Sequence, residues 1–422
     1  MSTNVTRLAN GMTVVTHAMP HLETVSLGIW VSCGARHEAV AENGISHLIE
    51  HMAFKGTQQR TARAIAEEIE QVGGELNAAT SLETTAYYAR ILKGDEGVAL
   101  DILADILQRP LYAADELERE REVILQEIAA TRDSPDEIAY DLIHDVAFPD
   151  QPVGRPILGS IESVKGFSVE DLRRFLGNNY RAGRLVLSAA GAVDHAKIVR
   201  HAEALFSGLS TGEAGHQQPA RYGGGIRAFD KPFEQTHVLV GFEGPAYRTP
   251  AFFTGQVYSG LLGGGMSSRL FQEVRERRGL CYAIYSSAWG FNDSGLFCIH
   301  AATGNDTMSE LIDVVAGEMK ALASEGPGAA EISRAKAQLK AGLLMGLESS
   351  SARAEQMARQ LLVYGRLLST AELVESVEAV TADRIRAFAA EMLTTATPSV
   401  VVVGAGRKSK SWAERFGKAL AA

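Results

Sequence analysis

The chain has 422 residues, and 46% of them are hydrophobic, which is enough for a large core and for more than one domain. Its 51 acidic residues outnumber the 41 basic ones, and a net charge of −10 disfavours binding to nucleic acid or anionic membranes. Three widely spaced cysteines exclude a disulfide framework. No run approaches about eighteen apolar residues, and the N-terminus lacks a signal-peptide pattern, so we expect a soluble cytoplasmic protein.

The N-terminal part of the chain is predicted to alternate strands and helices. Asn10-Gly11 is typical of a tight turn and predicts a hairpin. Residues 24–35 and 84–92 are rich in β-branched and aromatic residues and have strand character. Between them, residues 61–74 are predicted to form a helix, with Thr61 near its start and a glycine just past its end.

A short helix is also predicted within residues 44–57, GISHLIEHMAFKGT, where apolar residues recur at helical spacing. His47 and His51 are four residues apart and share one helix face, with Glu50 beside them. Two imidazoles and an adjacent carboxylate suit a tetrahedral zinc ion that keeps an open coordination position. Two solvated or packed histidines are the alternative, but H-x-x-E-H arises rarely by chance and favours the metal site.

A zinc site needs a further protein ligand, and the long helix predicted at residues 113–132 offers two acids. Glu120 and Glu127 are nearly two turns apart and share one face, and Val123 and Ile124 beside them are expected to pack inward. This helix is rich in glutamate and arginine, so either acid also fits a solvated surface position. Periodicity alone leaves the third ligand open.

The two halves of the chain repeat each other. Residues 168–180 and 381–393 each form a capped amphipathic helix followed by an apolar strand. Matching positions are separated by a constant 213 residues, as in Ser168 and Thr381, Phe175 and Phe388, and Gly191 and Gly404. A constant offset through helix, loop and strand indicates duplication.

We therefore predict an α+β fold of two homologous domains, each a mostly antiparallel sheet covered by helices on one face. The first domain is expected at residues 1–209 and carries the metal. The polar, glycine-rich residues 210–226 have linker composition. Residues 227–422 form the second domain, which lacks its own H-x-x-E-H.

His47, Glu50 and His51, followed after 75 residues by Glu127, resemble the signature of the pitrilysin/insulinase family of zinc peptidases. The resemblance covers the whole chain, and the chain length and single pair of halves most resemble the β subunit of the mitochondrial processing peptidase and its bacterial relatives. It implies one zinc ion per chain, held by His47, His51 and Glu127. It also implies that Glu120 orients a ligand histidine and that Glu50 is the general base for a metal-activated water.

The same resemblance assigns roles in other stretches. Residues 262–286, with a Gly-rich turn, resemble a second-domain stretch that carries an Arg–Tyr pair, here Arg275 and Tyr282, which implies transition-state and substrate contacts. A surface arginine and a packed aromatic are the alternative. Residues 77–91 resemble the edge strand that takes up peptide, which implies substrate contacts for the strand segment Asn77, Ala78 and Ala79.

Two acids share a helix face in the stretch SPDEIAYDLIHDVAF. Glu137 and Asp141 match positions at which the processing peptidase receives a substrate arginine, although a solvated acidic face is the alternative. We expect an endopeptidase for short or unfolded, basic peptides that works as a homodimer. The other readings are a non-catalytic core or partner subunit of the same fold, and a protease dedicated to maturing one peptide.

Overall fold

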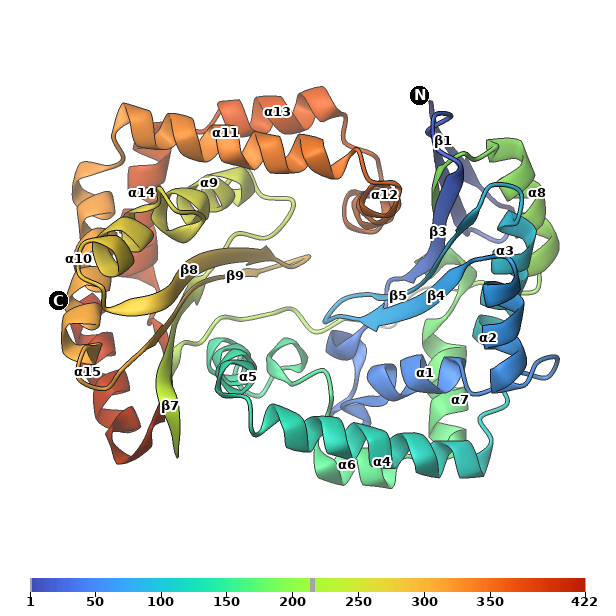
Figure 1. The fold of residues 1–422 in the computed structure, drawn as a ribbon, viewed down its shortest axis with the longest axis horizontal. Coiled ribbons are helices and arrows are strands. Elements are labelled where there is room, and N and C mark those ends of the chain that lie inside the picture. The colour runs from blue at the N-terminus through green and yellow to red at the C-terminus, as the bar shows by residue number, and fades with distance from the viewer. Residues whose placement is uncertain (1, 213–216, 422) are drawn as a thin grey trace. The chain divides into compact units, whose positions relative to one another are not determined.

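The computed structural model describes residues 2–212 and 217–421 (Figure 1). Residues 213–216 of the expected linker lie outside the described part of the chain. The chain folds into two compact units, and it crosses from one to the other several times. The first unit comprises Met1–Ile128, Pro156–Gln217 and Met345–Leu367, and the second comprises Ala129–Arg155, Gln218–Leu344 and Leu368–Ala422.

The first unit is built on a six-stranded sheet in the order β1-β2-β6-β3-β5-β4. Only β2 and β6 run parallel, and every other pair is antiparallel. The hairpin expected at Asn10-Gly11 joins β1 to β2. The strands are β1 (Thr3–Arg7), β2 (Thr13–Ala18), β3 (Thr24–Val31), β4 (Glu75–Thr80), β5 (Thr85–Leu92) and β6 (Leu185–Gly191).

Helices surround this sheet. They are α1 (Ile45–Ala53), α2 (Ala62–Gln71), α3 (Glu96–Gln108), α4 (Ala114–Thr131), α6 (Ile161–Gly166), α7 (Val169–Asn179), α8 (His195–Phe206) and α12 (Ser350–Tyr364). Short 3-10 turns of this unit are η1 (Ala35–His37), η2 (Val40–Glu42) and η4 (Ala182–Arg184), whereas η3 (Pro152–Gly154) belongs to the second unit.

The second unit contains a sheet in the order β10-β7-β9-β8. Its strands are β7 (Gly225–Glu243), β8 (Cys281–Gly290), β9 (Gly295–Thr303) and β10 (Ser399–Ala405). Its helices are α5 (Pro135–Ala147), α9 (Phe252–Gly263), α10 (Met308–Glu325), α11 (Ala329–Gly346), α13 (Thr370–Glu378), α14 (Ala382–Thr395) and α15 (Ser409–Ala421). Two short segments complete the unit. η5 (Phe271–Glu276) is π-helical, and η6 (Gly406–Lys408) is a 3-10 turn.

The strand pairing of the two sheets supports duplication. Val400–Val403 of β10 pairs with 226–229 of β7 in rising order and with 240–237 in falling order, so β10 lies between the two halves of β7. Read this way, the second sheet has the order β7 (first half), β10, β7 (second half), β9, β8. The first sheet has the same sequence of parallel and antiparallel neighbours in β2, β6, β3, β5, β4. The edge strands β4 and β8 are therefore equivalent.

Local chemistry repeats at the 213-residue offset as well. The side chains of Ser168 and Thr381 each cap their helix by accepting a hydrogen bond from the backbone N–H three residues on. Gly191 and Gly404, at the ends of β6 and β10, both have positive φ, at 124° and 102°. In each case a Cβ atom would clash with a carbonyl oxygen of the adjacent strand, so glycine is required at both positions.

Each sheet has a large core on one face, as expected, and on its other face a helix from the other half of the chain. In the first unit α12 packs on β2, β3 and β6, and Figure 1 shows α12 beside β3. Met357 of α12 is fully buried among residues such as Trp30 and Val186. In the second unit α5 packs on β7 and β10. The units therefore differ from the division predicted from sequence by these two helices, and residues 210–226 stay the proposed junction of the homologous halves.

In the described part of the chain, no helix is long and apolar enough to span a bilayer.

Because α12 is buried against the first sheet, we expect its core residue Met357 to contribute to the free energy of unfolding. Met357→Ala should lower the free energy of unfolding by about 2–5 kcal/mol, because it leaves a cavity between α12 and the sheet. Met345→Ala is the matched control, since Met345 is 68% exposed and its loss should change stability by less than about 0.5 kcal/mol. Urea unfolding of both variants is the measurement, and equal midpoints would contradict the packing of α12.

Candidate active site

The position of α1 is set at its N-terminus by a buried carboxylate. Gly44 has φ 96° and precedes the first helical residue. Glu38 is only 2% exposed, and its carboxylate accepts hydrogen bonds of 2.8 Å from the backbone N–H groups of both Gly44 and Ser46. Burial raises the pKa of Glu38, and these hydrogen bonds oppose that rise. Carboxylates near a helix N-terminus also interact favourably with the helix dipole.

The apolar stripe of α1 holds the helix against the first core and against β4. The residues of this stripe are Ile45, Leu48, Ile49 and Met52, all at most 1% exposed. With that face buried, His47 and His51 lie on the other side and are turned away from the core. Their ring centroids are 4.6 Å apart.

Helix α4 brings the third side chain to the same place. Its buried residues Leu117, Ile124 and Ile128 lie in the first core, and Glu120 and Glu127 follow the same helix face. The expectation that Val123 packs inward is wrong, because it is 40% exposed, whereas Ile124 is fully buried.

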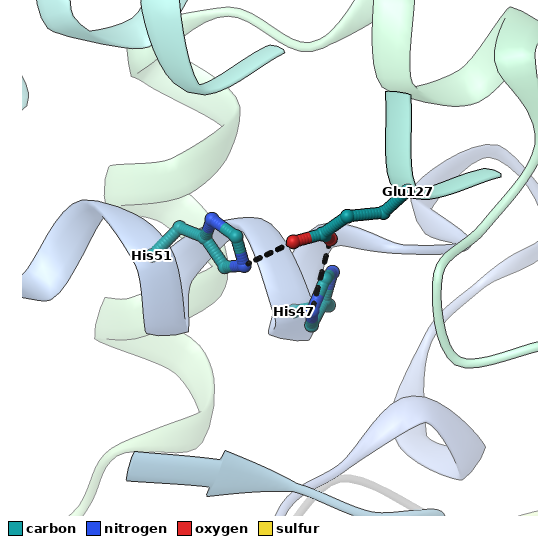
Figure 2. Close-up of side chains that lie close together, drawn as sticks. All are labelled: His47, His51 and Glu127. Carbon is teal, nitrogen blue, oxygen red and sulfur yellow. Dashed lines mark ion pairs between the residues drawn. The ribbon is translucent and has the colours of Figure 1, made fainter. Parts of the chain in front are cut away.

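Figure 2 shows the cluster that results, with the carboxylate of Glu127 reaching from α4 toward both imidazoles. One Glu127 oxygen lies 3.8 Å from His47 Nε2, and the other lies 3.8 Å from His51 Nε2. One ligand atom from each residue can be chosen so that all three lie within 4.8 Å of one another. These distances are too long for hydrogen bonds and leave space between the three groups.

His51 contacts a second acidic side chain, Glu120, which is in turn paired with Lys55. Its Nδ1 lies 3.0 Å from Glu120 Oε2, and the other oxygen of Glu120 lies 2.6 Å from Lys55 Nζ. A carboxylate only accepts hydrogen bonds, so this contact favours the tautomer that donates from Nδ1 and leaves the Nε2 lone pair toward Glu127. Glu120 is 6% exposed, which makes it a buried acceptor paired with a cation.

Two atoms near the cluster are buried without a partner among the described residues: Glu50 Oε2 and His47 Nδ1. Buried polar atoms are normally paired, so an unpaired carboxylate oxygen beside a histidine cluster indicates a functional role for Glu50. Burial, with a contribution from His51, lowers the pKa of His47 to about 4. The imidazole is therefore neutral at pH 7, as a metal ligand must be.

These donors fit zinc. Two neutral imidazoles and one carboxylate are a common donor set for catalytic zinc. Ligand atoms about 2.1 Å from a tetrahedral ion lie about 3.4 Å apart, and the observed separations of 3.8 Å are close to that.

The expected peptide-binding segment lies on β4, at the edge of the first sheet. Asn77 and Ala79 are exposed, whereas Ala78 is buried in the first core. Because α1 packs on β4, the metal ligands and this edge belong to one neighbourhood of the first unit.

Arg275 and Tyr282 lie in the second unit, in η5 and in the edge strand β8. The guanidinium of Arg275 lies 4.7 Å from the ring centroid of Tyr282 and also 4.7 Å from that of Phe271. These contacts bring the predicted pair together. Tyr282 is 76% exposed, so it is not the packed aromatic of the alternative reading.

Glu137 and Asp141 lie one turn apart on α5, in the second unit. Desolvation and the adjacent charge of Glu137 raise the pKa of Asp141 to about 6. Within the described residues neither acid forms an ion pair, which leaves two neighbouring acidic groups without a basic partner.

Sequence reasoning missed Glu38 and Lys55. Glu38 precedes the helix by seven residues and belongs to no local capping pattern, so no signal identified it. Lys55 is four residues beyond His51, and this spacing could have indicated a basic group near the ligand.

Comparisons with known proteins show the family of the chain. Residues 13–161 match the family model described as Insulinase (Peptidase family M16), and residues 166–339 match the one described as Peptidase M16 inactive domain. The fold and the His47, His51 and Glu127 cluster define a protein of two sheets with a candidate zinc site in its first unit. The chain belongs to the insulinase family of peptidases, family M16.

Individual relatives cover nearly the whole chain. A Rickettsia felis protein named "Uncharacterized zinc protease" is 41% identical over 94% of this chain and 97% of its own length. An Arabidopsis thaliana protein named probable mitochondrial-processing peptidase subunit beta is 37% identical, over 92% of this chain and 75% of its own. The crystal structure of a protease from Helicobacter pylori has a TM-score of 0.87 at 21% identity, covering 95% of this chain and 99% of that one, and shows the shared fold.

The cluster predicts an order of zinc affinities. Glu127→Gln should weaken zinc binding most, because a carboxamide is a poor replacement for an ionised ligand. Glu120→Gln should weaken it by roughly 10- to 100-fold, and Lys55→Met by less, since they act through His51. Glu122→Gln, at an exposed position of the same helix, is the control. Competition with a zinc-binding dye measures all four, and equal small effects would remove Glu127 from the ligand set.

Proposed function

We propose that the protein is a zinc-dependent endopeptidase that hydrolyses short or unfolded peptides. The observation that carries this proposal is the meeting of His47, His51 and Glu127 beside the orphaned oxygen of Glu50. The names of the relatives as zinc proteases support the same reaction class.

His47, His51 and Glu127 would hold one zinc ion per chain. Bound there, zinc supplies a Lewis acid and lowers the pKa of a coordinated water to about 7. Glu50 accepts the proton of the attacking water and passes it to the leaving amine. Glu120 and Lys55 keep His51 in the ligating tautomer. The roles of Arg275 and Tyr282 in substrate binding and oxyanion stabilisation stay predictions from the resemblance.

The peptide is proposed to add as a strand along β4, with Asn77, Ala78 and Ala79 as its nearest neighbours. An edge strand offers backbone N–H and C=O groups to an extended chain, and folded proteins seldom present one. This mode favours unfolded or short substrates.

A preference for basic peptides is proposed from Glu137 and Asp141. Desolvation and the neighbouring charge of Glu137 raise the pKa of Asp141, and an arginine or lysine side chain of the peptide would stabilise its ionised form. Cytoplasmic location and a two-fold homodimer also stay proposals, and light scattering of the active fractions tests the second.

Glu50→Gln tests the mechanism. The variant should lose cleavage by about 100-fold or more while it keeps its zinc, because an amide preserves shape but cannot accept the proton. Hydrolysis of unfolded peptides and zinc content are measured together, with Glu122→Gln as the control. Cleavage at the wild-type rate, or loss of zinc, would refute the assigned role, and a zinc-loaded wild type without activity would favour the non-catalytic reading.

A further inference from the structure

The edge strand β4 presents side chains to both faces of the first sheet. Ala78 faces the large core, together with Tyr87 of the neighbouring strand. Ala79 pairs with Ala86, and Asn77 with Tyr88, on the opposite face. A peptide strand added to β4 would also alternate, so every second side chain would point away from the face that carries α1. This step rests on the proposed function.

A cavity of about 340 Å³ opens on that opposite face. It is bounded by β3, β4 and β5 on one side and by α12 on the other, all within the first unit. It extends to Ala79 of the edge strand and to Ser81 and Thr84 of the β4–β5 turn. The cavity is thus adjacent to the edge at which a peptide would bind.

The floor of the cavity is aromatic. Trp30 and Tyr88 line it, and Gly28 lies between them on the sheet, where a Cβ would come within 2.7 Å of Tyr88 Cβ and 3.0 Å of Trp30 Cζ3. Glycine therefore lets the indole lie over the strand. Small side chains, Ala79, Ala86 and Ala354, leave the remaining space unfilled.

The charged side chains at the cavity are two arginines and one glutamate. Arg90 lies 3.9 Å from Glu75, and Arg359 lies 3.2 Å from Glu355. Each arginine therefore has a glutamate partner, and the charges at the cavity balance. A lysine or arginine side chain would lose hydration in this apolar space without gaining a free acidic partner, so the cavity disfavours one.

We propose that this cavity is a substrate side-chain pocket that takes a bulky aromatic or aliphatic residue of the peptide strand bound along β4. Burying such a side chain on Trp30 and Tyr88 gives selectivity at one strand position. The pocket would act independently of Glu137 and Asp141 on α5. It disfavours a basic side chain at its own strand position, whereas those two acids are proposed to favour a basic side chain elsewhere in the peptide.

Binding is measured separately from cleavage to test this. The zinc-loaded, full-length Glu50→Gln protein is titrated with positional-scanning decapeptide libraries in which one position at a time is fixed as Phe, Leu, Lys, Glu or Gly. We expect a position at which Phe and Leu bind roughly 10- to 100-fold tighter than Gly or Lys. Wild-type protein is assayed for cleavage of the same libraries.

Two variants, made in the same background, locate the selectivity. Ala86→Leu fills the cavity and should reduce the Phe-to-Gly ratio to about threefold or less. Arg90→Glu, at a side chain that is 60% exposed, should fold normally and raise the Lys-to-Glu ratio about tenfold. Ala337→Leu, on the exposed face of α11, is the matched control and should leave both ratios as they are.

The possible outcomes distinguish failure of the pocket proposal from failure of the peptidase proposal. Selective binding without cleavage by the wild type would support the pocket and refute the proposed function. Cleavage and binding with no aromatic or aliphatic preference at any position would overturn the pocket and leave the peptidase standing. The pocket is also overturned if Ala86→Leu and Arg90→Glu both retain the original ratios.

Discussion

The candidate site depends on the buried carboxylate of Glu38 at the start of α1. Its two hydrogen bonds to Gly44 and Ser46 fix where the helix begins and how it is rotated about its axis. His47 and His51 are within two turns of that anchor, so a shift of α1 by one residue would turn both imidazoles by about 100°. Isolated carboxylates are costly to bury, and the paired N–H groups offset that cost.

A second constraint acts on the ligand that lies further from this anchor. His51 is 18% exposed and belongs to the last turn of α1, where helices fray. Contact with Glu120, which is held in turn by Lys55, restrains the ring at a place where the backbone alone would not. The chain therefore secures one end of the cluster through backbone hydrogen bonds and the other through side chains. Such preorganisation is what a metal site with an open position requires.

Much of this was predictable because it depends on local periodicity. The shared face of His47 and His51, the caps at Ser168 and Thr381 and the 213-residue repeat all follow from short-range rules. The choice of Glu127 over Glu120 did not follow, because both lie on one face and the difference lies in which tertiary neighbour each meets. Family resemblance made that choice. Glu38 bonds to backbone N–H groups six and eight residues on, outside any periodic or capping pattern, and the packing of α12 on the first sheet is a long-range contact. The spacing of Lys55 from His51 is helical, but its contact with Glu120 of α4 has no local signal.

The exchange of α5 and α12 gives a physical reason for the second half to persist without metal ligands. Ser188 of β6 donates to the carbonyl of Ala354 at 2.7 Å, and Ser26 lies 2.9 Å from Ser350, so buried polar contacts fix how α12 sits on the first sheet. Without residues 345–367, the sheet that carries the site would expose the apolar face around Trp30 to water. The second half is therefore structurally required by the first, whether or not it has chemistry of its own. Changes in it can weaken the metal site by loosening the sheet behind α1, with no contact to the metal.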